Sequence, residues 1–157
     1  MKFILVTLLA VSSIQASQLR QVIDLNFSVK TNMAGFSFVG KLSEKKSIDQ
    51  GNTKKLQINP QDLTTEMSLR DEHMREQIFK NKPIIFEGKK DCTQKCILKG
   101  KLTISQTTKE VEIPLTQEGD DLFKLTHTIS LNAFGITKPE FMGVKVKDNV
   151  KVTATLK

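Results

Sequence analysis

Strict alternation of apolar and polar residues is the feature of this sequence that most limits its fold. Between residues 22 and 30, every second residue from Ile23 to Val29 is apolar, and the residues between them are polar. Successive side chains of a β-strand point to opposite faces, so this period of two predicts a strand with one buried face. The pattern recurs along the chain, with the following predicted inward sets: Phe36, Phe38, Gly40 and Leu42; Leu56 and Ile58; Leu98, Gly100, Leu102 and Ile104; Val111, Ile113 and Leu115; Phe123, Leu125, His127, Ile129 and Leu131; Val144 and Val146; Val150, Val152, Ala154 and Leu156.

Polar, turn-forming stretches separate these runs. The expected turns fall at residues 31–34, 49–52, 107–108, 119–120 and 148–149. About eight strands joined mostly by short turns predict an all-β antiparallel meander. Closing it into a barrel removes the exposed edges of an open sheet, and eight strands leave an interior that is either filled or wide enough for one small ligand. A β-sandwich has similar sequence statistics, so the pattern leaves both architectures open.

One helical insertion, at about residues 68–79, is expected between the strands. Ser68 is suited to cap a helix, and Asp71 three residues later gives a weak capping-box pattern. The expected apolar face holds Leu69, Met74 and Ile78, and the expected wet face holds Arg70, Glu72, Arg75 and Glu76. The segment is therefore either a surface connector with a solvated charge run or a lid across the end of a barrel.

The first residues have the pattern of a secretory signal peptide. Lys2 precedes an apolar run at residues 3–11, and Ala16 is a small residue at a plausible cleavage position. The apolar run is shorter than the roughly 20 residues that span a bilayer. We therefore expect residues 1–16 to be removed and residues 17–157, a length of 157 − 16 = 141, to form one periplasmic or secreted domain.

The charge of the chain favours anionic partners. The net charge is +7, and it becomes +6 when Lys2 is removed with the signal segment. A moderately basic exported protein suits anionic surfaces, phosphate groups or phospholipid heads. Nucleic acid is not an expected partner, because no basic run exceeds two residues and the chain has neither Trp nor Tyr to stack on bases.

The two cysteines, Cys92 and Cys96, flank a three-residue turn. In an oxidising compartment such a pair predicts a disulfide across the end of a hairpin. A metal site is the weaker alternative, because two cysteines alone provide half of a ligand set.

No catalytic constellation is visible in the sequence, and we expect no enzymatic activity, metal or cofactor. The two histidines, His73 and His127, lie in different predicted elements. Asp71 and His73 lack a third ligand, and the neighbouring arginines would repel a cation. His127 is in phase with apolar neighbours, so it is either a satisfied core histidine or a polar anchor inside a ligand cavity. The phenylalanines and methionines are open to the same choice between core and cavity.

Three stretches carry a pattern that is specific in combination. The first consists of Leu63-Thr64-Thr65, then Leu69-Arg70-Asp71-Glu72-His73-Met74-Arg75, Phe79, Lys82-Pro83 and Phe86. The second consists of Gly100-Lys101-Leu102-Thr103-Ile104 with Thr108-Lys109 and Val111. The third consists of Phe134-Gly135-Ile136 with Val146, Asp148 and Val150. Together they resemble the YceI-like family of exported, lipocalin-like barrels. The resemblance covers Leu63 to the C-terminus. The chain departs from the family pattern in its first strand, where the family's common histidine is missing.

The resemblance implies a single antiparallel eight-stranded lipocalin-like β-barrel whose apolar cavity binds or carries a long isoprenoid, either a polyprenyl phosphate or a quinone. One alternative is an interaction protein with a packed barrel and a basic rim that docks on another envelope component, and another is a lipid hydrolase or isomerase. Contact with an anionic membrane surface and a homodimer are further expectations. The predicted ligand-binding residues are Phe27, Phe36, Phe38, Leu56, Ile58, Met67, Arg70, His73, Met74, Arg75, Phe86, Leu102, Ile104, Ile113, Phe123 and His127.

Overall fold

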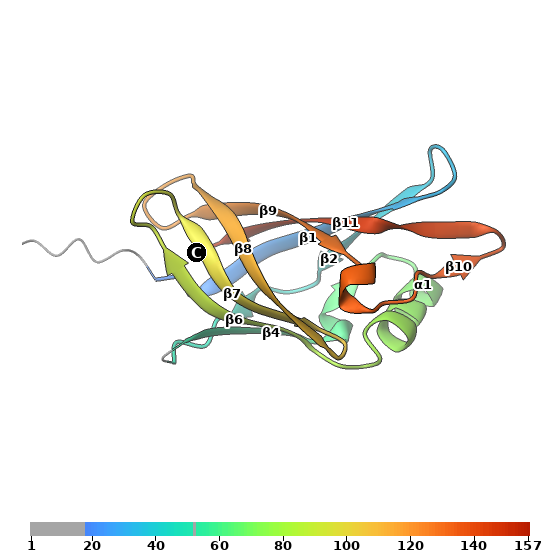
Figure 1. The fold of residues 1–157 in the computed structure, drawn as a ribbon, viewed down its shortest axis with the longest axis horizontal. Coiled ribbons are helices and arrows are strands. Elements are labelled where there is room, and N and C mark those ends of the chain that lie inside the picture. Colours follow the sequence, from blue (N-terminus) through green and yellow to red (C-terminus); the bar gives the residue numbers. More distant parts are fainter. Residues whose placement is uncertain (1–17, 52) are drawn as a thin grey trace, which may run out of the picture.

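A computed structural model describes residues 18–51 and 53–157 (Figure 1). The expected signal segment, residues 1–16, lies outside the described residues. Eight strands have five or more residues, and three further strands have two residues each. The strands are β1 (Gln21–Thr31), β2 (Ser37–Leu42), β3 (Lys46–Ser47), β4 (Lys54–Ile58), β5 (Leu63–Thr64), β6 (Ile84–Asp91), β7 (Ile97–Ile104), β8 (Thr107–Gln117), β9 (Phe123–Ser130), β10 (Glu140–Phe141) and β11 (Val144–Leu156).

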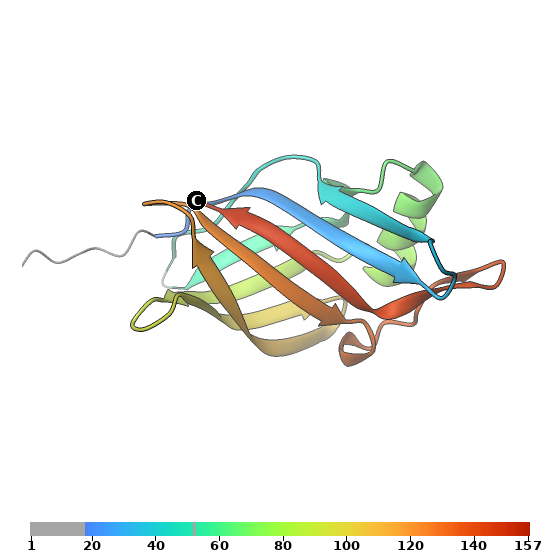
Figure 2. The same ribbon diagram turned by 90° about the horizontal axis from the view of Figure 1, so that it is seen from above.

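The strands form one curled antiparallel sheet, which confirms the predicted barrel and not the sandwich. The hydrogen-bonded order is β4-β6-β7-β8-β9-β11-β1-β2-β5. The two ends of this path, β4 and β5, are consecutive in the chain and are joined by the 3-10 turn η1 (Pro60–Asp62). The sheet therefore curls back on itself around an interior, as Figures 1 and 2 show from two sides. At the end of the barrel opposite η1, β3 pairs with β1, and Asp49 forms a bridge with Lys55.

The predicted alternation holds along most strands, but the start of β1 differs. Val22 is fully buried and lines the interior, whereas the sequence pattern assigned that role to Ile23. The register between β1 and β11 shifts between Val22 and Asp24, so one extra residue enters β1 there. Such a bulge reverses the phase of the side chains that precede it. From Leu25 to Val29 the inward set is as predicted.

The expected turn at residues 148–149 is wrong, because β11 runs unbroken from Val144 to Leu156. Asp148 instead receives hydrogen bonds from the Oγ of Ser130 at 2.6 Å and from the backbone N–H of Asn132 at 2.7 Å. These bonds fix the end of β9 and the 3-10 turn η3 (Asn132–Phe134) against β11. The expected turn at residues 107–108 is also displaced, since Ile104 pairs with Thr107 around Ser105 and Gln106.

The predicted helical insertion is confirmed as α1 (Ser68–His73), followed by one π-helical turn, η2 (Met74–Ile78). Figures 1 and 2 place α1 at the end of the barrel opposite the C-terminus. The predicted cap is wrong: Met67 is the N-cap residue, and Ser68 is already helical. The carboxylate of Asp71 does not cap the helix, and it accepts hydrogen bonds from Thr64 and Thr65 instead.

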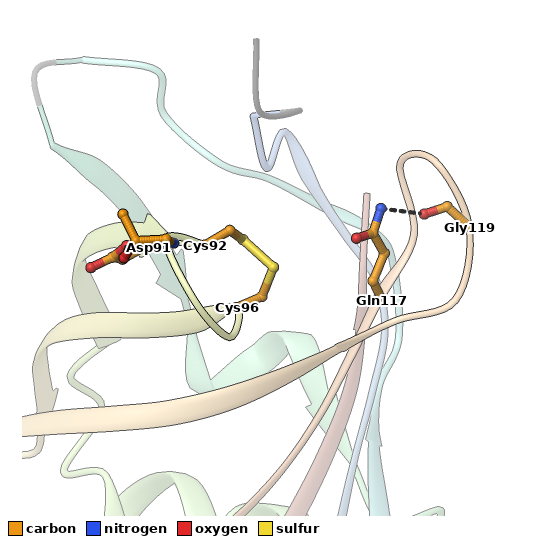
Figure 3. The surroundings of a disulfide bond; sticks show 6 residues. Asp91, Cys92, Cys96, Gln117 and Gly119 are labelled. Atoms are coloured by element: carbon orange, nitrogen blue, oxygen red, sulfur yellow. Dashed lines mark hydrogen bonds between the residues drawn. A yellow bond between two sulfur atoms is a disulfide. The ribbon is translucent and has the colours of Figure 1, made fainter. Parts of the chain in front are cut away.

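The end of the barrel near the C-terminus is closed by packed side chains. Val22 pairs with Leu156, which also pairs with Phe123, and all three side chains are buried. The expected disulfide, Cys92–Cys96, lies at this end across the turn between β6 and β7 (Figure 3). The backbone N–H of Leu115 donates to the Cys96 carbonyl oxygen at 2.8 Å, so the turn is attached to β8. Within the described residues, no helix has both the length and the apolar character needed to cross a membrane.

Candidate ligand cavity

The barrel encloses a cavity of about 750 Å³. This volume lies within the usual range of ligand pockets, about 300–1,000 Å³. Apolar side chains from the strands, α1 and η2 form most of its wall, and the polar or charged side chains that line it are Thr31, Lys54, Arg70, His73, Gln77, His127 and Glu140. The cavity contradicts the packed interior that the interaction-protein alternative requires.

The cavity opens at the end that carries α1. Phe36, Met67 and Leu69 line the cavity and are also exposed to solvent, so they mark where the interior meets water. Glu140 of β10 lines the same opening. We call this end, defined by Phe36, Met67, Leu69 and Glu140, the mouth.

Glycines on neighbouring strands make room for two of the aromatic side chains that line the cavity. The ring of Phe27 occupies the space that a side chain at Gly40 would need. On the opposite part of the sheet, the ring of Phe86 lies beside Gly88 and Gly100, which face each other on β6 and β7. Because the rings lie over bare backbone, the wall is apolar without filling the interior.

Most of the predicted ligand-binding residues lie on the cavity wall. Those that line it are Phe27, Phe36, Phe38, Leu56, Ile58, Met67, Arg70, His73, Met74, Phe86, Leu102, Ile104, Ile113 and His127. Their role in binding stays a prediction. For the residues on strands, the placement follows from the two-residue period, which puts every second side chain inside.

Arg70 and Arg75, both predicted to bind the ligand, are separated by the structure. The guanidinium carbon of Arg70 lies 4.3 Å from the centre of the Phe38 ring, on the cavity wall. Arg75 does not line the cavity; its Nε is buried without a hydrogen-bond partner among the described residues. Its charge instead helps to lower the pKa of Asp71. The positions lie five residues apart, more than one helical turn, so the two side chains leave the helix in different directions.

Phe123 also lies outside the cavity wall. It is in phase with Leu125 and His127, but it starts β9, where the barrel is closed. The side chain is buried, and the Lys90 Nζ lies 4.0 Å from the centre of its ring. Phe123 therefore packs the closed end, and the prediction of ligand contact is not supported by its position.

His127 lies in the middle of the wall. It pairs with Val152, which pairs with Phe27, so these three residues form one row across β9, β11 and β1. Burial lowers the pKa of His127 below its ordinary value, because the charged imidazolium is poorly solvated there. No hydrogen bond joins its side chain to another residue of the described part of the chain. His127 is therefore not a core histidine satisfied by a hydrogen bond, and its role as a polar anchor for a ligand stays a prediction.

Sequence reasoning missed several residues that line the cavity, among them Thr31, Lys54, Gln77 and Glu140. Two of them carried a usable signal. Thr31 continues the phase of Phe27 and Val29, and its Oγ1 donates to the Phe36 carbonyl oxygen at 2.8 Å. Gln77 follows Arg70 and His73 at helical spacing on the inner face of the insertion. Glu140 belongs to a two-residue strand that no periodicity reveals.

A metal site is not formed by the candidates considered from the sequence. Asp71 is bound to Thr64 and Thr65, whereas His73 lines the cavity. In residues 18–51 and 53–157 no group of three or more His, Cys, Asp or Glu side chains is placed to hold a metal ion.

Comparison with known proteins identifies the family of this barrel. The model of the YceI-like domain matches residues 11–157, almost the whole chain. The chain belongs to the YceI-like family. No curated protein matches the sequence.

Two solved structures share the fold of this YceI-like chain. One is BcnA of Burkholderia cenocepacia, with a TM-score of 0.60 and 17% identity over 84% of this chain and 94% of that one. The other is described as a polyisoprenoid binding domain from Saccharophagus degradans implicated in plant cell wall breakdown; its TM-score is 0.61, with 11% identity over 88% of this chain and 97% of that one. At these identities the comparisons establish the lipocalin-like fold.

Proposed function

We propose that this protein binds a long-chain isoprenoid, or a similar amphiphilic lipid, in the barrel cavity. The observation that carries the proposal is the apolar cavity of about 750 Å³, open at the mouth. Membership of the YceI-like family and the likeness to a polyisoprenoid binding domain support it. The role is that of a binding or carrier protein without a catalysed reaction.

The energy of such binding comes from the hydrocarbon chain. Each buried CH₂ contributes about 0.8 kcal/mol, so ten buried isoprenoid carbons supply roughly 8 kcal/mol before the cost of association. The apolar wall, including Phe27, Phe86 and Ile104, gives affinity for any chain that fits. Selectivity must then come from the few polar groups.

Arg70 is the candidate for selecting the head group. It lies on the wall beside Phe38, and its guanidinium suits two hydrogen bonds to a phosphate. A polyprenyl phosphate would use this charge, whereas a quinone would use it much less. A phosphate-bearing ligand would therefore interact with both the apolar wall and the charge of Arg70, and we take it as the first candidate.

The place of action we propose is the cell envelope, either the periplasm or the exterior. The signal-like first residues and the Cys92–Cys96 disulfide support this location, since disulfides persist in oxidising compartments.

Native mass spectrometry tests the proposal. The protein purified gently from its source should carry an apolar adduct, and emptied protein should take up a polyprenyl phosphate or a quinone added in solution. Ala154→Phe and Val150→Phe would each fill part of the cavity and should reduce uptake. Thr153→Phe, between two residues of the wall but not part of it, is the matched control and should bind normally. A folded protein that shows neither an adduct nor uptake would overturn the proposal.

A further inference from the structure

Exposed apolar side chains gather at the mouth. Among the described residues, six large apolar side chains are strongly exposed, and five of them lie at this end: Met33, Phe36, Met67, Leu69 and Met142. The sixth, Val39, lies on β2. Met142 is 86% exposed and Phe36 is 63% exposed. Scattered single apolar residues are normal on a protein surface, but a cluster at one end indicates an interaction site.

Two hairpin tips present part of this cluster as one unit. Met33 lies in the turn between β1 and β2, and Met142 lies in the turn between β10 and β11. Asn32 ties the two hairpins together: its backbone N–H donates to the Lys145 carbonyl oxygen at 2.9 Å, and its Oδ1 accepts from the Lys145 N–H at 2.8 Å. Figures 1 and 2 show both hairpins at the end that carries α1. The two methionines are therefore held at the same end of the barrel.

The exposed cluster is continuous with the cavity. Phe36, Met67 and Leu69 belong both to the exposed set and to the cavity wall. A hydrocarbon chain that moves from an apolar environment at this end into the cavity would contact apolar side chains along its way. Passage through water would instead cost about 0.8 kcal/mol for each exposed CH₂.

The two hairpins that carry Met33, Phe36 and Met142 are basic. Residues 30–37 and 131–147 contain four lysines (Lys30, Lys138, Lys145 and Lys147) and one acidic residue, Glu140, which gives a formal charge of 4 − 1 = +3. Glu140 is paired with Lys145 at 3.3 Å. Lys30 and Lys147 are exposed on the neighbouring strands β1 and β11. Basic residues around exposed apolar side chains fit a surface that is anionic on the outside and becomes apolar a short distance below it.

We propose that the mouth docks on the surface of a bilayer that contains anionic phospholipids, with Met33, Phe36 and Met142 inserted at the head-group level and Lys30 and Lys147 among the phosphates. In this pose the cavity opens directly toward the hydrocarbon. The purpose of such docking rests on the proposed lipid-binding function, but the docking itself requires no isoprenoid, so the two are tested separately.

Vesicle co-sedimentation is the test. The probe is a vesicle of phosphatidylcholine and phosphatidylglycerol without any isoprenoid, compared with phosphatidylcholine alone. The protein should bind the anionic vesicles, and added salt should weaken the binding because it screens the lysines. Met33→Ser with Met142→Asn should weaken binding roughly tenfold. Asn is chosen because Met142 has a positive φ of 49°, which Asn tolerates.

The lysines are tested with a charge-matched pair. Lys30→Gln with Lys147→Gln should weaken vesicle binding roughly fivefold for each lysine. Lys95→Gln with Lys157→Gln removes the same charge from exposed positions at the closed end and should leave binding unchanged. Val39→Ser is the control for the methionines, because it removes an exposed apolar side chain away from the hairpin tips.

The outcomes separate the explanations. Equal loss of binding in the tip variants and the controls would overturn the proposed docking surface, and so would an absence of vesicle binding by the folded protein. Dimerisation that depends on Met33 and Met142, measured by sedimentation velocity without vesicles, together with no vesicle binding, would assign the face to a second copy instead. Vesicle binding by a protein that takes up no isoprenoid would overturn the proposed function and leave the docking surface standing.

Discussion

Asp71 Oδ1 accepts two hydrogen bonds from Thr65, one from its backbone N–H at 2.7 Å and one from its Oγ1 at 2.6 Å. The other carboxylate oxygen accepts from the Thr64 Oγ1 at 2.8 Å. These bonds join α1 to the end of β5 on the barrel wall. A single buried carboxylate therefore holds the helical segment across the mouth.

Replacing Asp71 by Asn should destabilise the protein by about 2–3 kcal/mol. The amide nitrogen would face donor groups, so buried donors would lose their acceptor. Burial opposes ionisation of Asp71, but the bonds from Thr65 and Thr64 and the charge of Arg75 outweigh it and lower the pKa. A lowered folded-state pKa gives stability that is present above the unfolded value, near 3.8, and is lost as the pH falls through the folded value.

Urea unfolding of wild type, Asp71→Asn and Glu72→Gln between neutral pH and strong acid checks this prediction. Glu72 is the exposed neighbour on α1, so its variant removes the same charge without breaking buried bonds. The stability difference between wild type and Asp71→Asn should shrink in acid, whereas Glu72→Gln should follow wild type. A difference that persists unchanged in acid would mean that the carboxylate charge is not what stabilises the helix.

The glycines of the wall should differ in how they tolerate alanine. At Gly40 the obstacle is the far end of the Phe27 side chain, which has the cavity to move into, so Gly40→Ala should cost about 1 kcal/mol and reduce lipid uptake. At Gly88 the obstacle is the backbone of Lys99 and Gly100 on the paired strand, and Gly88→Ala should cost about 3 kcal/mol.

Thermal unfolding of the two glycine variants, compared with Gly51→Ala, measures these costs. Only ordinary contacts surround a side chain at Gly51, so this variant should be close to wild type. Equal melting temperatures for Gly40→Ala and Gly88→Ala would contradict the distinction between a movable ring and a fixed backbone.

The sequence predicts the wall of the barrel well, but it does not predict the irregular points of the fold. The alternation identified most of the inward side chains because burial of one face acts on every second residue of a strand. It misplaced Ile23 because the bulge at the start of β1 depends on pairing with β11, which is distant in the chain. The Asp-Asn pair at residues 148–149 predicts a turn, whereas tertiary hydrogen bonds keep Asp148 within a strand.

The candidate site was predicted less completely than the wall. Phe123 has the right phase but lies where the barrel closes, and phase does not report depth along a strand. Arg70 and Arg75 look equivalent in the sequence, whereas only Arg70 lies on the cavity wall, because positions five residues apart on a helix point in different directions. The volume of the cavity cannot be predicted from the alternation, because it depends on where the rings of Phe27 and Phe86 lie.

Arg70 and Arg75 should therefore respond differently to substitution by Gln. Arg70→Gln should weaken binding of a polyprenyl phosphate roughly tenfold, because a charge-assisted bond to phosphate is lost, and should affect a quinone little. Arg75→Gln should leave both affinities unchanged and lower stability by about 1 kcal/mol, because its interaction with Asp71 is lost. Titrations with the two ligands, together with urea unfolding, check both parts. Equal effects of Arg70→Gln on the two ligands would exclude phosphate pairing.

His127 should make both stability and lipid binding depend on pH. Its pKa is lowered by burial, so between the folded value and the unfolded value, near 6.5, the unfolded chain takes up a proton more readily than the folded protein. Stability should therefore fall as the pH drops below about 6.5. A hydrocarbon ligand would remove more water from His127 and lower its pKa further, so uptake should also weaken in acid.

His127→Leu should reduce both effects, whereas Thr128→Val, which changes the outward-facing neighbour, should retain them. Uptake by wild type that is equally strong at about pH 7.5 and about pH 5 would show that the ligand does not reach His127.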